Sequence, residues 1–212
     1  PSAVAYNPVV LTGGRSGVGT VTLNGKAPAG GFEVLLTADN GIFTIPASVT
    51  VAEGASSATF PVSALVVDTD TVVTTTATAN GTTVTKTITV AAPVLSTVTV
   101  ASTLNGGAST VGKVTLTGIA PAGGVMVSLV SNNAAVSVPA TVTVPEGALS
   151  ANFTATSVAV NVDTTGTVVA TQGAVSKSAN VTVRAAVVSA LTASPTSLKG
   201  GNNITFRVTL GS

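Results

Sequence analysis

The 212-residue chain contains no cysteine, no histidine and no tryptophan, and it has one tyrosine, Tyr6. Without cysteine there can be no disulfide and no thiolate metal site. Without histidine the commonest general base and metal ligand is missing, and triads that pair serine or cysteine with histidine are excluded. We therefore expect no enzyme activity and no cofactor.

Charged residues are also scarce: they make up 7% of the chain, and the net charge is +1. A typical soluble domain has about 25% charged residues. The eight lysines and arginines are scattered, and nucleic-acid binding needs them clustered against phosphates, so no nucleic-acid partner is expected. No run of about twenty apolar residues is present, and we expect no membrane insertion. Hydrophobic residues at 45% are too many for a disordered chain.

The sequence instead contains a long internal repeat. IPASVTVAEGASSATF begins at Ile45 and VPATVTVPEGALSANF begins at Val138, a shift of 93 residues (138 − 45). APAGG, at Ala27, returns at Ala120 with the same shift. About 93 residues is the size of one small β-sandwich domain. The repeat predicts one domain over 1–94, a second over 95–187, and the first strands of an incomplete third over 188–212.

Within each copy, short runs of Val, Thr and Ile alternate in period two between glycine, proline and Asn-Gly turns, which indicates β-strands. No stretch shows helical periodicity. The pattern predicts an all-β fold of tandem immunoglobulin-like β-sandwiches, and the short apolar joints VAAPVL and VRAAVV predict a rod-like array. In the first copy we expect strands near 3–6, 18–24, 32–38, 42–45, 48–52, 57–64, 71–79 and 83–90. Positions that stay apolar between the copies are the predicted core: Val34, Leu36, Phe60, Val127, Leu129 and Phe153.

VPATVTVPEGALSANFTAT, the VTL.G.APAGG segment and the closing KTITV resemble the Ig-like repeats of large bacterial cell-surface and secreted proteins. The resemblance covers the whole chain. It implies stalks, adhesins and fibres located outside the cell or on its surface, and it implies no reaction.

The VPEG…F segment is also similar to Calx-β repeats, which bind calcium through acidic loops. Acidic residues are sparse here, and Asp68 and Asp70 form the only close pair. Calcium needs six to eight oxygen ligands, several of them from carboxylates. Asp68 and Asp70 are therefore weak calcium candidates, and we expect no metal site.

A lysine lies in the last predicted strand of each copy, at Lys86 and Lys177. Lysine on an apolar strand raises the alternative of a self-formed Lys–Asn isopeptide bond, which needs a buried carboxylate beside the two side chains. No such Lys–Asn–Glu set recurs in both copies. We expect these lysines to pack their stems and keep their charges in solvent.

The third copy is the feature from which a function can be inferred. Two strands cannot bury a core, so residues 188–212 must pack back on the second copy or be completed by other strands. Completion by another chain is strand addition, and a head-to-tail contact that does not close produces a filament. The alternative is that the sequence is a section of a longer array. The assembly residues we predict are Ile204, Phe206 and Val208.

The sequence thus favours a structural protein, a subunit of an extracellular filament or surface array. Its expected partners are copies of itself or neighbouring repeats of a longer chain. Assembly would use apolar faces, with exposed positions such as Leu35, Met126 and Val130, and strand complementation by 188–212. The second hypothesis is a stalk, spacer or adhesion module of a large modular surface protein or secreted carbohydrate-active enzyme. The lack of tryptophan favours a spacer over a sugar-binding role.

Overall fold

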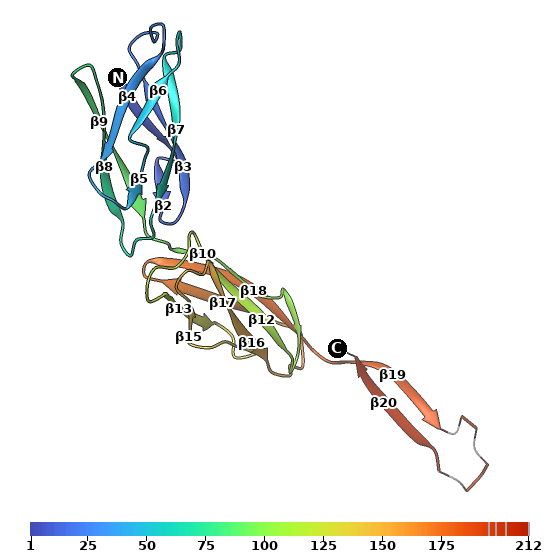
Figure 1. Ribbon diagram of the computed structural model, residues 1–212. Helices are drawn as coiled ribbons and strands as arrows, with labels where there is room; N and C mark the ends of the chain where they lie inside the picture. Colours follow the sequence, from blue (N-terminus) through green and yellow to red (C-terminus); the bar gives the residue numbers. More distant parts are fainter. Residues whose placement is uncertain (195, 198, 202, 212) are drawn as a thin grey trace. The chain divides into compact units, whose positions relative to one another are not determined.

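The computed structural model describes residues 1–194, 196–197, 199–201 and 203–211. All regular elements in these residues are β-strands, and their hydrogen bonds join them into five sheets (Figure 1). The predicted all-β class and the tandem immunoglobulin-like sandwiches are confirmed. In the same residues there is no helix long and apolar enough to cross a membrane.

The first sandwich consists of a four-stranded sheet, ordered β1-β3-β7-β5, and a five-stranded sheet, ordered β2-β9-β8-β4-β6 (Figure 1). Strand β2 runs parallel to β9, whereas the other pairings in these two sheets are antiparallel. The predicted strands match the observed ones to within a few residues except that β2 was not predicted. The strand bounds are β1 (Ala3–Asn7), β2 (Val10–Thr12), β3 (Ser16–Thr22), β4 (Phe32–Ala38), β5 (Phe43–Thr44), β6 (Ser48–Val51), β7 (Ser57–Ala64), β8 (Thr71–Ala79) and β9 (Thr82–Ala91).

The second sandwich repeats this arrangement with a four-stranded sheet, β10-β12-β16-β14, and a five-stranded sheet, β11-β18-β17-β13-β15. The registers also repeat at a shift of 93: Gly19 lies opposite Phe60 in the first sandwich, and Gly112 lies opposite Phe153 in the second. The bounds are β10 (Leu95–Thr99), β11 (Thr103–Asn105), β12 (Ser109–Leu116), β13 (Val125–Ser131), β14 (Val136–Ser137), β15 (Thr141–Val144), β16 (Ser150–Ser157), β17 (Thr164–Gln172) and β18 (Val175–Arg184).

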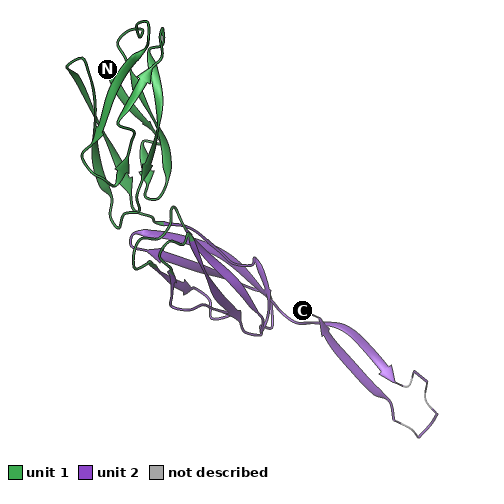
Figure 2. Cartoon of the chain, in the orientation of Figure 1, with its two compact units in different colours: residues 1–94, 116–125, 144–149 green, residues 95–115, 126–143, 150–212 purple. Residues whose placement is uncertain are grey.

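The chain forms two compact units, shown in Figure 2. The first contains residues 1–94 with 116–125 and 144–149, and the second contains 95–115, 126–143 and 150–212. The two short segments grouped with the first unit lie mostly in connections between strands of the second sandwich. The domain boundaries at 94/95 and 187/188 come from the sequence repeat and stay a prediction.

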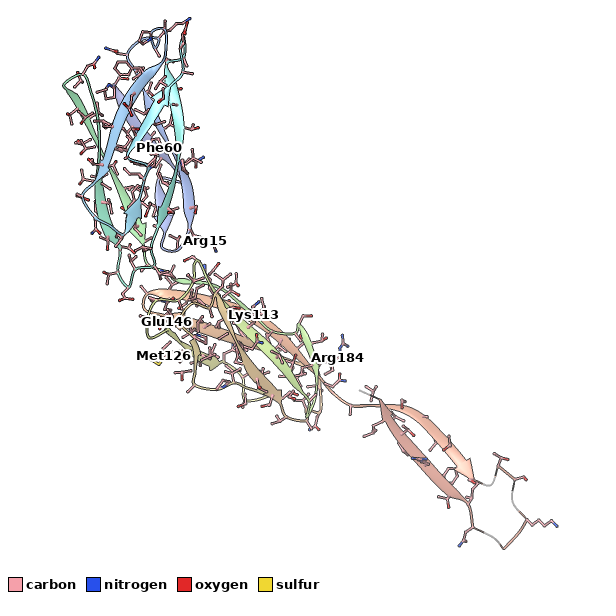
Figure 3. The ribbon with its side chains drawn as sticks, viewed as in Figure 1. Arg15, Phe60, Lys113, Met126, Glu146 and Arg184 are labelled. Atoms are coloured by element: carbon pink, nitrogen blue, oxygen red, sulfur yellow. The ribbon has the colours of Figure 1, made fainter. Side chains whose placement is uncertain are left out.

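Strand alternation decides which side chains form the core. Val34 and Leu36 of β4 are buried, while Leu35 between them is exposed, because successive side chains of a strand point to opposite faces of the sheet. Phe60 points between the sheets of the first sandwich (Figure 3). Three side chains of the second sandwich, Val127, Leu129 and Phe153, are buried in the same manner.

A glycine on the strand beside each core phenylalanine leaves room for its ring. A Cβ atom added at Gly19 would lie 2.2 Å from the nearest ring atom of Phe60. One added at Gly112 would lie 2.3 Å from the ring of Phe153. Both distances are far below van der Waals contact, so each ring occupies the space that a side chain at the glycine would need. The pairing of a glycine with a phenylalanine is therefore a packing requirement of both sandwiches.

Tyr6 joins the two sheets of the first sandwich through a buried hydrogen bond. Its hydroxyl donates to Thr75 Oγ1 on β8, and the hydroxyl of Thr75 donates to the carbonyl oxygen of Lys86 at 2.8 Å. The Tyr6 ring meets Phe43 and Phe60 edge-on, with centroids 5.5 and 6.3 Å apart. Such edge-to-face pairs stabilise a core beyond the area they bury.

Burial raises the pKa of the Tyr6 hydroxyl, while its hydrogen bond to Thr75 acts in the opposite direction. A folded-state pKa above the unfolded value means that the folded state holds the proton more tightly. The stability from neutral Tyr6 is thus complete below about pH 10, the pKa of an unfolded tyrosine, and is lost as pH rises through the folded pKa.

We expect ionisation of Tyr6 to contribute to alkaline unfolding of the first sandwich. In Tyr6→Phe the free energy of unfolding at neutral pH falls by about 1 kcal/mol, because one buried hydrogen bond is lost. Above pH 10 the difference between wild type and variant shrinks. Urea unfolding followed by hydrogen exchange at pH 7 and pH 11 checks this, and a difference that grows with pH would contradict it.

Candidate assembly surface

Strands β19 (Val187–Ser194) and β20 (Thr205–Gly211) form a two-stranded antiparallel sheet (Figure 1). Leu191 is opposite Val208, and Ala193 is opposite Phe206. The register shifts once, between Val188 and Ala190. In the part of the chain that the structure describes, no third strand joins this pair, which we call the terminal hairpin.

The terminal hairpin is amphipathic, and its apolar face is uncovered. Leu191, Phe206, Val208 and Leu210 share one face by strand alternation and are 65%, 62%, 57% and 63% exposed. The other face carries threonine, serine and Arg207, together with Ala190 and, beyond the register shift, Val187. Two of the predicted assembly residues, Phe206 and Val208, therefore lie side by side on the apolar face. The third, Ile204, lies just before β20 and is 37% exposed.

The terminal hairpin has the same register as β1 and β3 of the first sandwich, at a shift of 187 residues (189 − 2). The pair Val4–Val21 of the first sandwich corresponds to the pair Leu191–Val208 of the hairpin. Tyr6 opposite Gly19 becomes Ala193 opposite Phe206. The hairpin thus has the register of the first and third strands of a sandwich, and its apolar face corresponds in sequence position to the face that β1 and β3 bury.

The environment of the two strand pairs is what differs. In the first sandwich β3 pairs on its second edge with β7, and Val4 and Val21 are buried. Among the described residues the second edge of β20 has no partner strand, and the equivalents of these valines are exposed. An unpaired edge beside an uncovered apolar face is a template for strand addition.

Some exposed apolar side chains lie on strands of the two sandwiches. Leu35 on β4, and Met126 and Val130 on β13, are each more than half exposed, and the side chain of Met126 projects from the surface in Figure 3. The positions equivalent to Met126 and Val130 in the first copy are Glu33 and Thr37. The two sandwiches therefore do not share this apolar stripe.

Several carboxylates accept hydrogen bonds from backbone amides of their own sandwich. Asp70 Oδ1 accepts from the amide of Ala92 at 2.8 Å, and Asp163 Oδ1 accepts from Ala185 at 2.9 Å. Among the described residues there is no group of three or more acidic, histidine or cysteine side chains that could hold a metal ion. The arrangement around the weak calcium candidates Asp68 and Asp70 suits strand anchoring, because Asp70 fixes the backbone at the end of β9.

The glutamates of the EGA turns also accept hydrogen bonds from backbone amides. Glu53 accepts from the amide of Gly30 at 3.3 Å, and Glu146 accepts from the amide of Gly123 at 3.4 Å.

We expect Asp70→Ala to lower the free energy of unfolding of the first sandwich by about 1 kcal/mol, the usual net contribution of such a hydrogen bond. Asp163→Ala should do the same in the second. Calorimetric melting of both variants and of the wild type, with calcium and with a chelator, is the measurement. A rise in the wild-type melting temperature on adding calcium, absent in Asp70→Ala, would contradict the anchoring role.

Both strand lysines, Lys86 and Lys177, are exposed. A Lys–Asn isopeptide bond forms between side chains that are buried beside a carboxylate, and neither lysine is buried. The geometry at these positions does not support that chemistry.

Comparison with known proteins gives structural similarities only. No family model and no curated relative matches the chain. Domains D0–D1 of intimin are similar over 86% of this chain and 96% of theirs, with 15% identity and a TM-score of 0.34. Domains 4 and 5 of the S-layer protein SbsC match 72% of this chain and 77% of theirs, with 20% identity and a TM-score of 0.34. The match to the I9–I11 tandem of titin covers 99% of this chain and 76% of the titin chain, with 8% identity and a TM-score of 0.38. At such TM-scores the similarities carry no argument about function.

Proposed function

We propose that this chain is a structural module of an extracellular filament or surface array, and that the terminal hairpin is its joint. The observation that carries the proposal is the hairpin itself. Its register is that of β1 and β3, yet the apolar face that those strands bury is exposed. Strands from outside the described residues complete it, and these come from a further repeat or from a neighbouring subunit.

Two kinds of contact would hold the joint. A strand added to the free edge of β20 supplies backbone hydrogen bonds, as β7 does for β3. A second sheet over the apolar face removes Leu191, Phe206, Val208 and Leu210 from water, and each contributes about 1.5–3 kcal/mol when fully buried. The summed free energy from burying four such side chains is comparable to the association cost of about 4–15 kcal/mol. The backbone hydrogen bonds of an added strand are therefore needed as well.

The composition supports a packed, extended assembly. With 7% charged residues and a net charge of +1, copies of the chain repel one another only weakly. Exposed Met126, Val130 and Leu35 offer further apolar contacts between neighbours. A location outside the cell is part of the proposal and follows from the sequence resemblance.

The test compares the chain with the same chain stopped at residue 187, by sedimentation and negative-stain electron microscopy. We expect the full chain to associate through its uncovered hairpin and the shortened chain to remain single. Equal behaviour of the two would contradict a joint at the hairpin. If both then remain single, the chain is a spacer module of the stalk class; if both associate, the sandwich faces are the contacts.

A further inference from the structure

In both sandwiches a bulky core side chain faces a glycine on the neighbouring strand. Across three strands of the first sandwich, the row reads Tyr6 on β1, Gly19 on β3 and Phe60 on β7. The ring of Phe60 lies over Gly19, at 2.2 Å from where a Cβ would be. Gly112 and Phe153 repeat the arrangement in the second sandwich.

In the terminal hairpin the large and the small side chain of the corresponding pair have changed strands. Ala193 stands in the place of Tyr6, and Phe206 stands in the place of Gly19. The central strand therefore brings its own ring, and the outer strand that held a ring now holds a methyl group. In a sandwich completed on this hairpin, the ring of Phe206 would take the space that the ring of Phe60 takes in the first sandwich.

We propose that the strand completing β20 carries glycine, alanine or serine opposite Phe206. This rests on the proposed function, because it assumes that the hairpin is the beginning of a sandwich. A strand that carries phenylalanine at that position, as β7 and β16 do, cannot pair with β20 in a completed sandwich. Strands β7 and β16 of another copy therefore do not complete the hairpin. Copies of this chain associate with one another by packing the apolar faces of their hairpins, and a complete sandwich requires an acceptor strand of matching size.

The physical reason does not depend on how the Phe206 side chain is turned. The Cβ of any residue in the place of Gly19 falls inside the ring of a phenylalanine positioned as Phe60 is. One of the two residues must shift, and neither can do so freely in a close-packed core. With a small residue opposite, the ring of Phe206 can lie across the neighbouring strand, as the ring of Phe60 lies across β3.

The experiment extends the full chain after Ser212 with a second copy of residues 26–94, which supplies the remaining strands of a first-type sandwich. Ser212 corresponds to Gly25 at the shift of 187, so the added segment continues the repeat without a gap. Four versions are made: Phe206 or Phe206→Gly in the hairpin, each with the added segment carrying Phe60 or Phe60→Gly. Tryptic cleavage after Arg207, within β20, reports whether the hairpin is held in a sandwich.

We expect slow cleavage in the two versions that pair one phenylalanine with one glycine. The version with phenylalanine at both positions should be cut at least about tenfold faster, since cleavage follows the population of opened strands. Equal protection of the version with two phenylalanines and the version with Phe206 opposite glycine would overturn the size rule.

The version with Phe206→Gly and the original Phe60 separates this inference from the proposed function. It restores the pairing observed in the first sandwich, so it should be protected whether or not the size rule for Phe206 holds. If all four versions are cut as fast as the chain without the added segment, the hairpin is not the beginning of a sandwich, and the proposed function fails as well.

Discussion

Gly19→Ala is expected to lower the free energy of unfolding of the first sandwich by about 3 kcal/mol, the upper part of the range for overpacked cores. The substitution adds one methyl group, and helix or turn preferences are not involved because Gly19 lies in the middle of β3. The cost arises from the ring of Phe60, which would lie 2.2 Å from the new carbon. Fluorescence of Tyr6, the single tyrosine, follows the unfolding of this sandwich in urea.

Two further variants identify the ring as the cause. Gly25→Ala is the matched control, because a Cβ there meets nothing within 4 Å, and its effect should stay below about 0.5 kcal/mol. Phe60→Ala alone should cost about 3–5 kcal/mol. The double variant Gly19→Ala/Phe60→Ala should cost clearly less than the sum of the two, since the clash is gone. Simple additivity would contradict the packing requirement.

Phe206→Asp is expected to weaken association of the chain at least about a hundredfold, because covering the hairpin would then bury an unpaired carboxylate. Phe206 is 62% exposed in the single chain, so the substitution removes no contact that the chain itself needs. The weight-average mass in sedimentation equilibrium, measured over a series of concentrations, gives the association constant.

Thr205→Asp is the matched control for this prediction. It places the same charge one residue away on β20, where strand alternation directs it to the polar face. Its association constant should stay within about threefold of wild type. If both variants lose association equally, net charge and not the apolar face governs the contact.

Much of the fold follows from period-two patterning and the internal repeat. Conserved apolar parity between the copies identified Val34, Leu36 and Phe60 as core residues, and all three are buried. The short strand β2 was not predicted, because three residues after Pro8 are too few to show alternation. Its position depends on parallel pairing with β9, about 80 residues away in the chain, and no local pattern reports such a contact.

The candidate surface was predicted only in part from the sequence. The partial match of residues 188–212 to the start of the first copy, and the apolar residues Ile204, Phe206 and Val208 within it, are visible in the sequence. The size reversal was not identified, although aligning the third copy with the first places Phe206 on Gly19. That alignment becomes informative only when the register shows which residue of β7 faces the glycine. The role of Asp70 as an anchor for the backbone of Ala92 likewise depends on a contact between distant segments.

The most direct test of the central claim, that the terminal hairpin is the beginning of a sandwich, is backbone hydrogen exchange in the chain extended with residues 26–94 carrying Phe60→Gly. Strand β3 of the same molecule is the internal standard, since it occupies the equivalent place in a complete sandwich. The account predicts that the amides of Thr205–Gly211 exchange slowly, at rates approaching those of Ser16–Thr22. Exchange of these amides at the rate seen in the unextended chain would contradict it.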